Sequence, residues 1–293
     1  MESGSNSLMG QIEKALPGMS KGQKAIATFI LTHYEHAAYI TAARIGDEAG
    51  VSESTVVRFA MELGFEGYPH FQKVLQEELK GRLTSVQRMK ASAKLTDRDD
   101  VLGAVLLSDV EKLKRTYERI DRQSFNKAVD LILDAHKIFI LGVRSAAPLA
   151  SFLGFYFNLI FDNVRLVHTT SVSEMFEQIL YVREGDVVIG ISFPRYSKRT
   201  IKAMNYSRST GATVIAITDK AGTPISDSAD VCLLAPSDMT SFVDSLVAPL
   251  SVITALIAAI GFKRQKLVSD TLEKLERIWD EYEVYDKGDV PNE

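Results

Sequence analysis

Two short stretches in the second half of the chain combine hydroxyl side chains with cations. One reads Gly142-Val143-Arg144-Ser145, and the other runs from Ser192 to Thr200 through Ser192-Phe193-Pro194-Arg195-Tyr196-Ser197. Hydroxyl groups, the free N–H groups of a helix start and the forked guanidinium of arginine all donate to phosphate oxygens. The two stretches therefore predict an anion-binding pocket. Its candidate ligand-binding residues are Gly142, Arg144, Ser145, Ser192, Arg195, Ser197 and Thr200.

The same stretches argue against several common chemistries. With one glycine, the first stretch is neither a dinucleotide-binding G-x-G-x-x-G nor a P-loop. His168 and Glu174 lie near a strand end and could enter the pocket, but His168 also fits an ordinary residue that closes a strand and Glu174 an ordinary charge at a helix start. The five histidines and the single cysteine, Cys232, lack metal-ligand spacing. We expect no catalytic residues, no metal and no cofactor.

A second constellation lies near the N-terminus, over residues 41–59. Thr41 begins a short helix through Ala49, Gly50 supplies the positive φ of a tight turn, and Ser52 begins a second helix to about residue 63. Gly46 predicts a close helix crossing at its position, since glycine inside a helix costs ~1 kcal/mol relative to alanine. This pattern indicates a helix-turn-helix rather than a plain helical hairpin. Its candidate DNA-binding residues are Arg44, Ser52, Glu53, Ser54, Thr55 and Arg58.

The elements that must position the predicted pocket are five apolar runs separated by helical segments. The runs are Lys137–Leu141, Val164–His168, Val187–Ser192, Thr213–Thr218 and Val231–Leu234. Their spacing fits repeated βαβ units and a five-stranded parallel sheet covered on both faces. Ligands of such sheets bind beyond the carboxyl ends of the strands, where both donor-rich stretches fall.

The fold class predicted is therefore α/β, with an all-α N-terminal domain followed by an α/β/α domain. The boundaries we expect are residues 1–80 for the helix-turn-helix, 81–123 for a helical connector, 124–265 for the sheet domain and 266–293 for a C-terminal helix and tail. The connector region 81–124 carries ten basic and seven acidic side chains. In the last segment, Leu272, Leu275, Trp279 and Tyr282 have the spacing of an inward helical face.

Composition excludes other classes of protein. The chain has 293 residues, of which 46% are hydrophobic and 25% charged, with a net charge of −4. That is an ordinary globular composition, and any DNA contact must come from a local basic face. The N-terminus lacks an apolar signal segment, and residues 246–260, at fifteen, fall short of the roughly 20 that a membrane span needs. We expect a cytoplasmic protein with no membrane partner.

The two constellations together resemble the RpiR-type family of bacterial transcriptional regulators over about residues 8–265. The most specific stretches are Gly50–Phe59 with Leu63-Gly64-Phe65, and Ile191–Ser197. The resemblance implies a SIS (sugar isomerase) domain after the helix-turn-helix, a double-stranded DNA operator and a phosphorylated sugar effector. Catalytic SIS domains usually have a Ser-x-Ser-Gly-x-Thr-like loop, and here Pro194 and Arg195 stand at the second serine and glycine positions. This departure counts against isomerase chemistry.

The resemblance also implies dimerisation through apolar helices, and residues 149–161 and 246–260 are apolar enough to serve in a homodimer or tetramer. Two alternatives stay open. One is a phosphosugar isomerase with an accessory helical domain, and the other is a phosphosugar-binding adaptor that does not bind DNA.

Overall fold

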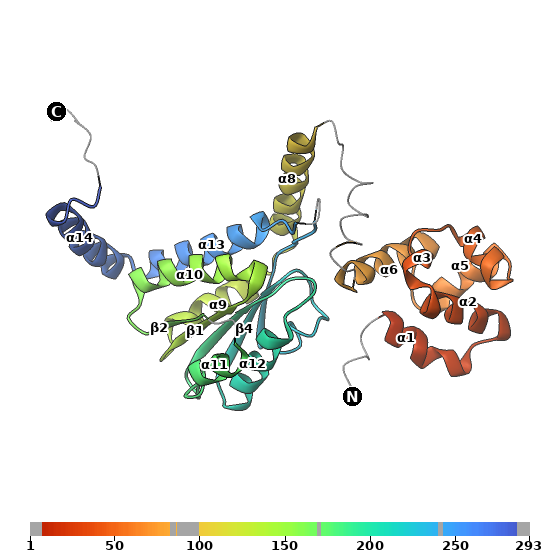
Figure 1. Ribbon diagram of the computed structural model, residues 1–293, viewed down its shortest axis with the longest axis horizontal. Coiled ribbons are helices and arrows are strands. Elements are labelled where there is room, and N and C mark those ends of the chain that lie inside the picture. The colour runs from red at the N-terminus through yellow and green to blue at the C-terminus, as the bar shows by residue number, and fades with distance from the viewer. Residues whose placement is uncertain (1–7, 83–85, 87–99, 169–170, 240–242, 286–293) are drawn as a thin grey trace. The chain divides into compact units, whose positions relative to one another are not determined.

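The computed structural model describes residues 8–82, 86, 100–168, 171–239 and 243–285. The chain divides into two compact units, Met1–Asp99 and Asp100–Glu293, each with its own core (Figure 1). Most of the expected connector before residue 100 lies outside the described residues. Its helical remainder, α8 (Val101–Arg119), belongs to the second unit.

The first unit is helical throughout its described part. Its elements are α1 (Leu8–Ala15), the 3-10 turn η1 (Leu16–Gly18), α2 (Lys21–Thr32), α3 (Tyr34–Ala37), α4 (Ala42–Ala49), α5 (Glu53–Glu62) and α6 (Tyr68–Arg82). A capping box starts α2, because the Ser20 side chain accepts from the Gln23 N–H and the Gln23 side chain accepts from the Ser20 N–H. Phe59 and Phe71 meet edge to face, with ring centroids 5.9 Å apart, where α5 packs on α6.

The second unit is built on an all-parallel sheet. Its strands are β1 (Ile138–Gly142), β2 (Val164–Val167), β3 (Val187–Ile191), β4 (Thr213–Thr218) and β5 (Val231–Leu234), in the spatial order β2-β1-β3-β4-β5. The helices and turns around it are α9 (Arg122–Leu133), η2 (Arg144–Ala146), α10 (Ala147–Ile160), α11 (Val172–Gln178), α12 (Lys198–Ser209), α13 (Val247–Lys263) and α14 (Gln265–Glu281).

Both faces of the sheet are covered, which gives three layers (Figure 1). Alternate residues of one strand enter opposite cores, since strand side chains alternate in direction. Ile138 and Ile140 join the core formed with α9, α10 and α13. Phe139 and Leu141 join the core formed with α11 and α12. The predicted α/β fold with five parallel strands is confirmed, and each strand lies within one residue of its predicted bounds.

A C-terminal helix is present, as expected, but its expected inward face is only partly covered: Leu275 and Trp279 are half-buried, and Leu272 is exposed. Among the described residues, α14 has no fully buried side chain, and Tyr282, expected to face inward, is 71% exposed. The inward spacing is present in the sequence, but α14 packs only lightly on α10 and α13. An amphipathic pattern shows which face is apolar and not whether the same chain covers it.

The helix α8 also carries an uncovered apolar face. Its exposed large side chains are Val101, Leu102, Leu106, Leu107, Val110 and Tyr117. The two expected dimerisation segments, α10 and α13, contribute most of their apolar residues to their own core. Their exposed large apolar side chains are Phe155, Tyr156, Leu250 and Phe262. No single helix in the described ranges has both the length and the hydropathy of a membrane span. The pair α13 and α14 passes such a test only jointly, across a 99° bend.

Candidate DNA-recognition helix and anion-binding edge

The turn between α4 and α5 has the close crossing that the sequence predicts. A Cβ added to Gly46 would lie 2.7 Å from the carbonyl oxygen of Val51 and 3.2 Å from the amide nitrogen of Glu53. Gly50 ends α4 with φ 70°, and the Val51 N–H donates to the Gly46 carbonyl at 2.8 Å. Only a residue without a side chain fits position 46, because both neighbouring atoms belong to the backbone.

The outer face of α5 presents polar side chains on an apolar support. Val56, Phe59 and Ala60 are buried. Among the predicted DNA-binding residues, Thr55 is half-buried. The exposed ones are Arg44, Ser52, Glu53, Ser54 and Arg58. The geometry thus leaves them available at the N-terminal end of a helix that follows a tight turn, which is where helix-turn-helix proteins contact base edges.

Ser52 differs from the expectation in one respect. It occupies the N-cap position of α5, but its side chain makes no capping bond to the backbone. Its Oγ instead lies 2.9 Å from Ser54 Oγ and 2.8 Å from Thr55 Oγ1. These three hydroxyls form one cluster at the helix start.

An ionic network that the sequence analysis missed holds Arg44. The Arg44 Nε donates to Glu48 Oε1 at 2.9 Å, and the same oxygen lies 3.2 Å from His36 Nε2. The hydrogen bond with His36, together with the charges of His36 and Arg44, lowers the pKa of Glu48. The spacing of four residues between Arg44 and Glu48 on one helix could have predicted their ion pair from the sequence. Nothing in the sequence indicated the contact between His36 and Glu48, which are twelve residues apart.

At the other unit, the two donor-rich loops follow neighbouring strands. Gly142, the last residue of β1, is the register partner of Ile191, the last residue of β3. After this point the chain turns to opposite faces, because α10 packs in one core and α12 in the other. The strand order of the sheet reverses between β1 and β3. In open α/β sheets, ligands bind at the carboxyl ends of the strands where the order reverses in this way.

The residues of the β1 loop lie at this edge as expected. A Cβ on Gly142 would lie 2.8 Å from the Ala146 carbonyl oxygen and 2.8 Å from the Ala150 Cβ, so the close start of α10 requires glycine. Arg144 and Ser145 are exposed in the turn η2 that leads into α10. Arg144 has φ 57°.

In the β3 loop, the two serines are organised by hydrogen bonds. Ser192 is buried, and its Oγ accepts from the Ser197 N–H at 2.9 Å. The Ser197 Oγ accepts from the Thr200 N–H at 3.3 Å and so caps α12. Arg195 is exposed, with φ 63°. Thr200 is fully buried, and its Oγ1 has no hydrogen-bond partner among the residues that the structure describes. It therefore lies beneath the helix start and not on its surface.

A buried pair behind this loop was also missed by the sequence analysis. The Tyr196 hydroxyl donates to Asp219 Oδ1 at 2.9 Å, and the Thr218 hydroxyl lies 3.3 Å from the same oxygen. Burial raises the pKa of Asp219, and burial together with the nearby Asp219 charge raises the pKa of Tyr196. Asp219 directly follows β4, so inspection of every strand end could have found it.

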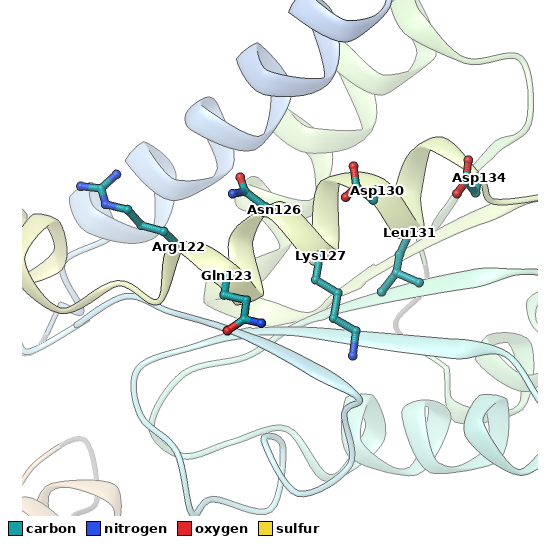
Figure 2. Close-up of a pocket in the computed structure, with 7 residues that line it drawn as sticks. All are labelled: Arg122, Gln123, Asn126, Lys127, Asp130, Leu131 and Asp134. Carbon is teal, nitrogen blue, oxygen red and sulfur yellow. The ribbon is translucent and has the colours of Figure 1, made fainter.

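The surface depression in Figure 2 is a different feature. It measures about 640 Å³ and is lined by α9 and the residue that follows it. The lining residues are Arg122, Gln123, Asn126, Lys127, Asp130, Leu131 and Asp134. It contains none of the predicted ligand residues. Asp130 there pairs with Lys263 at 2.6 Å. Mixed charges on one exposed helix face need no ligand to explain them.

Comparison with known protein families matches both units. Residues 6–82 match the helix-turn-helix domain of the rpiR family, and residues 131–259 match the SIS domain. The chain belongs to the RpiR-type family. It combines that family's helix-turn-helix with a SIS domain, as the resemblance implied.

Individual relatives agree over nearly the whole chain. The HTH-type transcriptional regulator HexR of Escherichia coli strain K12 is 28% identical over 276 residues, which is 92% of each chain. HexR of Pseudomonas aeruginosa is 25% identical and covers 88% of this chain and 90% of its own. Their names describe transcriptional regulators.

Solved structures share the fold. The NanR protein of Vibrio vulnificus, complexed with ManNAc-6P, has a TM-score of 0.56 at 19% identity and covers 94% of this chain and 99% of its own. The sugar isomerase domain of an RpiR transcription factor from Sphaerobacter thermophilus has a TM-score of 0.58 at 23% identity, over 61% of this chain and 99% of that domain.

Proposed function

We propose that this protein is a DNA-binding transcriptional regulator of sugar metabolism genes. Its operator binding is modulated by a phosphorylated sugar held at the carboxyl edge of the sheet. The observation that carries the proposal is the pairing, in one chain, of an exposed polar helix start after a tight turn with two donor-rich loops that follow neighbouring strand ends. The family of both units supports it.

In this proposal, α5 enters the major groove of DNA. Arg58 can donate two hydrogen bonds to a guanine edge, and the hydroxyl cluster of Ser52, Ser54 and Thr55 can bond to phosphates or bases. Arg44 and Glu53 lie at the margins of that contact. The two acidic residues Glu48 and Glu53 reduce nonspecific attraction to the phosphate backbone, so specificity depends on base contacts.

The effector's phosphoryl group would lie at the start of α12. Ser145, Ser192 and Ser197 supply hydroxyl donors, and the N–H groups of the helix start add a partial positive charge. Gly142 keeps the β1 loop close to the sheet. Thr200, being buried, supports the helix start and contacts the ligand only if that turn rearranges.

The protein is, in this proposal, a regulator and not an enzyme. Relatives of the same length are named as transcriptional regulators. Pro194 and Arg195 also replace the serine and glycine that bring a catalytic SIS loop close to a phosphate. Turnover of hexose phosphates at ordinary enzymatic rates would contradict this part of the proposal and favour the isomerase alternative.

We further propose a cytoplasmic homodimer or higher oligomer. The exposed apolar side chains of α8, and Phe155 and Tyr156 of α10, occur in groups. Grouped apolar side chains indicate an interaction surface, whereas single exposed ones are ordinary. A twofold assembly would present two recognition helices to two half-sites. The domain boundaries expected at residues 80, 123 and 265 stay part of this proposal.

The test is binding of the full chain to DNA from its own upstream region, followed by fluorescence anisotropy. Arg58→Ala should weaken binding by about 10-fold or more, the usual worth of a bidentate base contact. Lys73→Ala removes one exposed cation from the same unit and should change affinity much less. Equal DNA affinity of Arg58→Ala and wild type would contradict the recognition-helix assignment. Absence of DNA binding by the wild type would favour the adaptor alternative.

A further inference from the structure

We propose that Asp238 and Ser245, in the loop that follows β5, are positioning residues that couple the effector site to the DNA-binding unit through α8. The inference rests on the proposed function, because it assumes that one chain binds both a phosphorylated effector and DNA. It goes further by naming the contacts through which the first affects the second. Neither residue needs to contact the effector or the DNA.

The helix α8 is the element through which any such effect reaches the first unit. It begins at Val101, at the start of the second unit, and the first unit directly precedes it in the chain. The start of α8 is therefore the point at which the second unit is attached to the DNA-binding unit. A small shift of α8 on the sheet domain moves this point, and shifts of packed helices are a common form of allosteric change.

The loop after β5 contacts α8 at two points, which we call the α8 anchor. Asp238 Oδ2 accepts from Arg115 Nη1 at 2.9 Å, and the Ser245 hydroxyl donates to Asp109 Oδ1 at 2.6 Å. The same oxygen of Asp109 accepts from the buried ammonium of Lys112. The second contact thus lies at the covered face of α8, where a change in the loop alters how the helix packs.

The same loop begins at the sheet edge where the effector is proposed to bind. The Ala235 N–H donates to the Thr218 carbonyl at 2.8 Å, and the next residue, Asp219, accepts from the Tyr196 hydroxyl at 2.9 Å. Tyr196 directly precedes Ser197 in the β3 loop. Covalent and hydrogen bonds therefore connect the β3 loop with Asp238 and α8 without a gap. Contiguous networks of this kind are a physical route by which one site influences another.

The α8 anchor can change its arrangement at small cost. The side chains of Arg115 and Asp238 are 37% and 41% exposed, so water can replace their ion pair. Ser237, next to Asp238, is 3% exposed, and its Oγ has no hydrogen-bond partner within the described part of the chain. A buried hydroxyl without a partner is unfavourable, so a second arrangement that gives it one is stabilised. Both features suit a contact that an effector breaks or tightens.

The first experiment measures the affinity of the full chain for its upstream DNA, by fluorescence anisotropy, with and without a phosphosugar. The probe is whichever of glucose 6-phosphate, fructose 6-phosphate and N-acetylmannosamine 6-phosphate raises the melting temperature of the wild type most. Asp238→Ala and Ser245→Ala should each reduce the change in DNA affinity that the probe causes by at least threefold.

Two controls separate coupling from a general structural role. Both variants should keep the affinity for the probe, and the DNA affinity without it, within about twofold of wild type. Asp162→Ala removes an exposed carboxylate from the turn before β2, at the other edge of the sheet. It should respond to the probe as the wild type does.

A second measurement needs no ligand. Tyr196→Phe removes the hydroxyl at the effector end of the network, and amide exchange of peptides covering residues 101–119 should become at least threefold faster. Peptides from α14 should be unchanged. In the Asp238→Ala background the same substitution should have no further effect on α8, because the last bond of the network is already absent.

A full response to the probe in both Asp238→Ala and Ser245→Ala would overturn the coupling proposal and leave the proposed function standing. Exchange of α8 that Tyr196→Phe leaves at the wild-type rate would do the same, and this measurement decides the case in which none of the three probes binds. A wild type that binds neither its upstream DNA nor any of the probes would contradict the proposed function itself.

Discussion

The tight crossing at Gly46 gives a sharp test of the helix-turn-helix. In Gly46→Ala, the new Cβ would lie 2.7 Å from the Val51 carbonyl oxygen and 3.2 Å from the Glu53 amide nitrogen. Both atoms belong to the turn backbone, so no side chain can swing aside. Overpacking of this kind costs about 1–3 kcal/mol, and the better helix propensity of alanine returns up to ~1 kcal/mol. Because the contact is with backbone atoms, we expect an overpacking cost near the upper end of that range. The net loss in the unfolding free energy of the first unit is then about 1–2 kcal/mol.

A matched control lies in the same unit. In Gly22→Ala, the added Cβ would make ordinary contacts, at 3.5 Å with Val51 Cγ1 and 3.6 Å with Thr55 Cγ2. Gly22 lies in the first turn of α2, so the same chemical change should be neutral or slightly stabilising. The pair separates the effect of the site from the effect of replacing glycine.

Amide hydrogen exchange of the full chain measures the local free energy of opening directly. Peptides covering residues 42–63 should exchange about 5- to 30-fold faster in Gly46→Ala and no faster in Gly22→Ala. Peptides from the sheet of the second unit should be unchanged in both. Protection of residues 42–63 that matches wild type in Gly46→Ala would refute the close crossing.

Three further predictions concern charged groups. Lys112 is 2% exposed and donates to Asp109 Oδ1 at 3.2 Å and to Ser108 Oγ at 2.7 Å. Asp109→Ala should lower the unfolding free energy of the second unit by about 3 kcal/mol, since it leaves the buried ammonium without its carboxylate, and urea unfolding that matches wild type would contradict this. Burial raises the pKa of Asp219, so between its usual value and its folded value the native chain binds more protons than the unfolded chain, and stability falls as pH rises. The stability of Asp219→Asn relative to wild type should accordingly grow as pH rises through that window, and a pH-independent difference in thermal unfolding would refute the assignment. Glu48→Gln removes the negative charge that pairs with Arg44, so DNA affinity should rise, and unchanged anisotropy titrations would show that Arg44 takes no part.

Much of the fold follows from sequence periodicity. The strands β4 and β5 have their predicted bounds, because continuous apolar runs between turn residues have few alternatives in a covered parallel sheet. The helical connector expected over residues 81–123 is interrupted at Ile120, whose extended backbone ends α8. Asp121 accepts from the Gln123 and Ser124 N–H groups and starts α9. An aspartate at a helix start was the signal for this boundary.

The site was less accessible to sequence reasoning. The residue types in the two loops indicate anion binding, but the left-handed backbone of Arg144 and Arg195 does not follow from residue type, since arginine rarely adopts it. The bond between Tyr196 and Asp219 joins residues that are 23 apart and depends on the adjacency of β3 and β4. Such contacts are set by topology and not by local pattern.

The central claim is that a phosphorylated ligand at the sheet edge alters DNA binding by the same chain. The direct measurement is the operator affinity of the full chain with and without saturating effector, in wild type and in Ser192→Ala combined with Ser197→Ala. We predict a 5- to 150-fold change in DNA affinity for wild type, the usual range of allosteric coupling, and no change for the double variant, whose DNA affinity without effector matches wild type. A double variant that responds to the effector as wild type does would contradict the account.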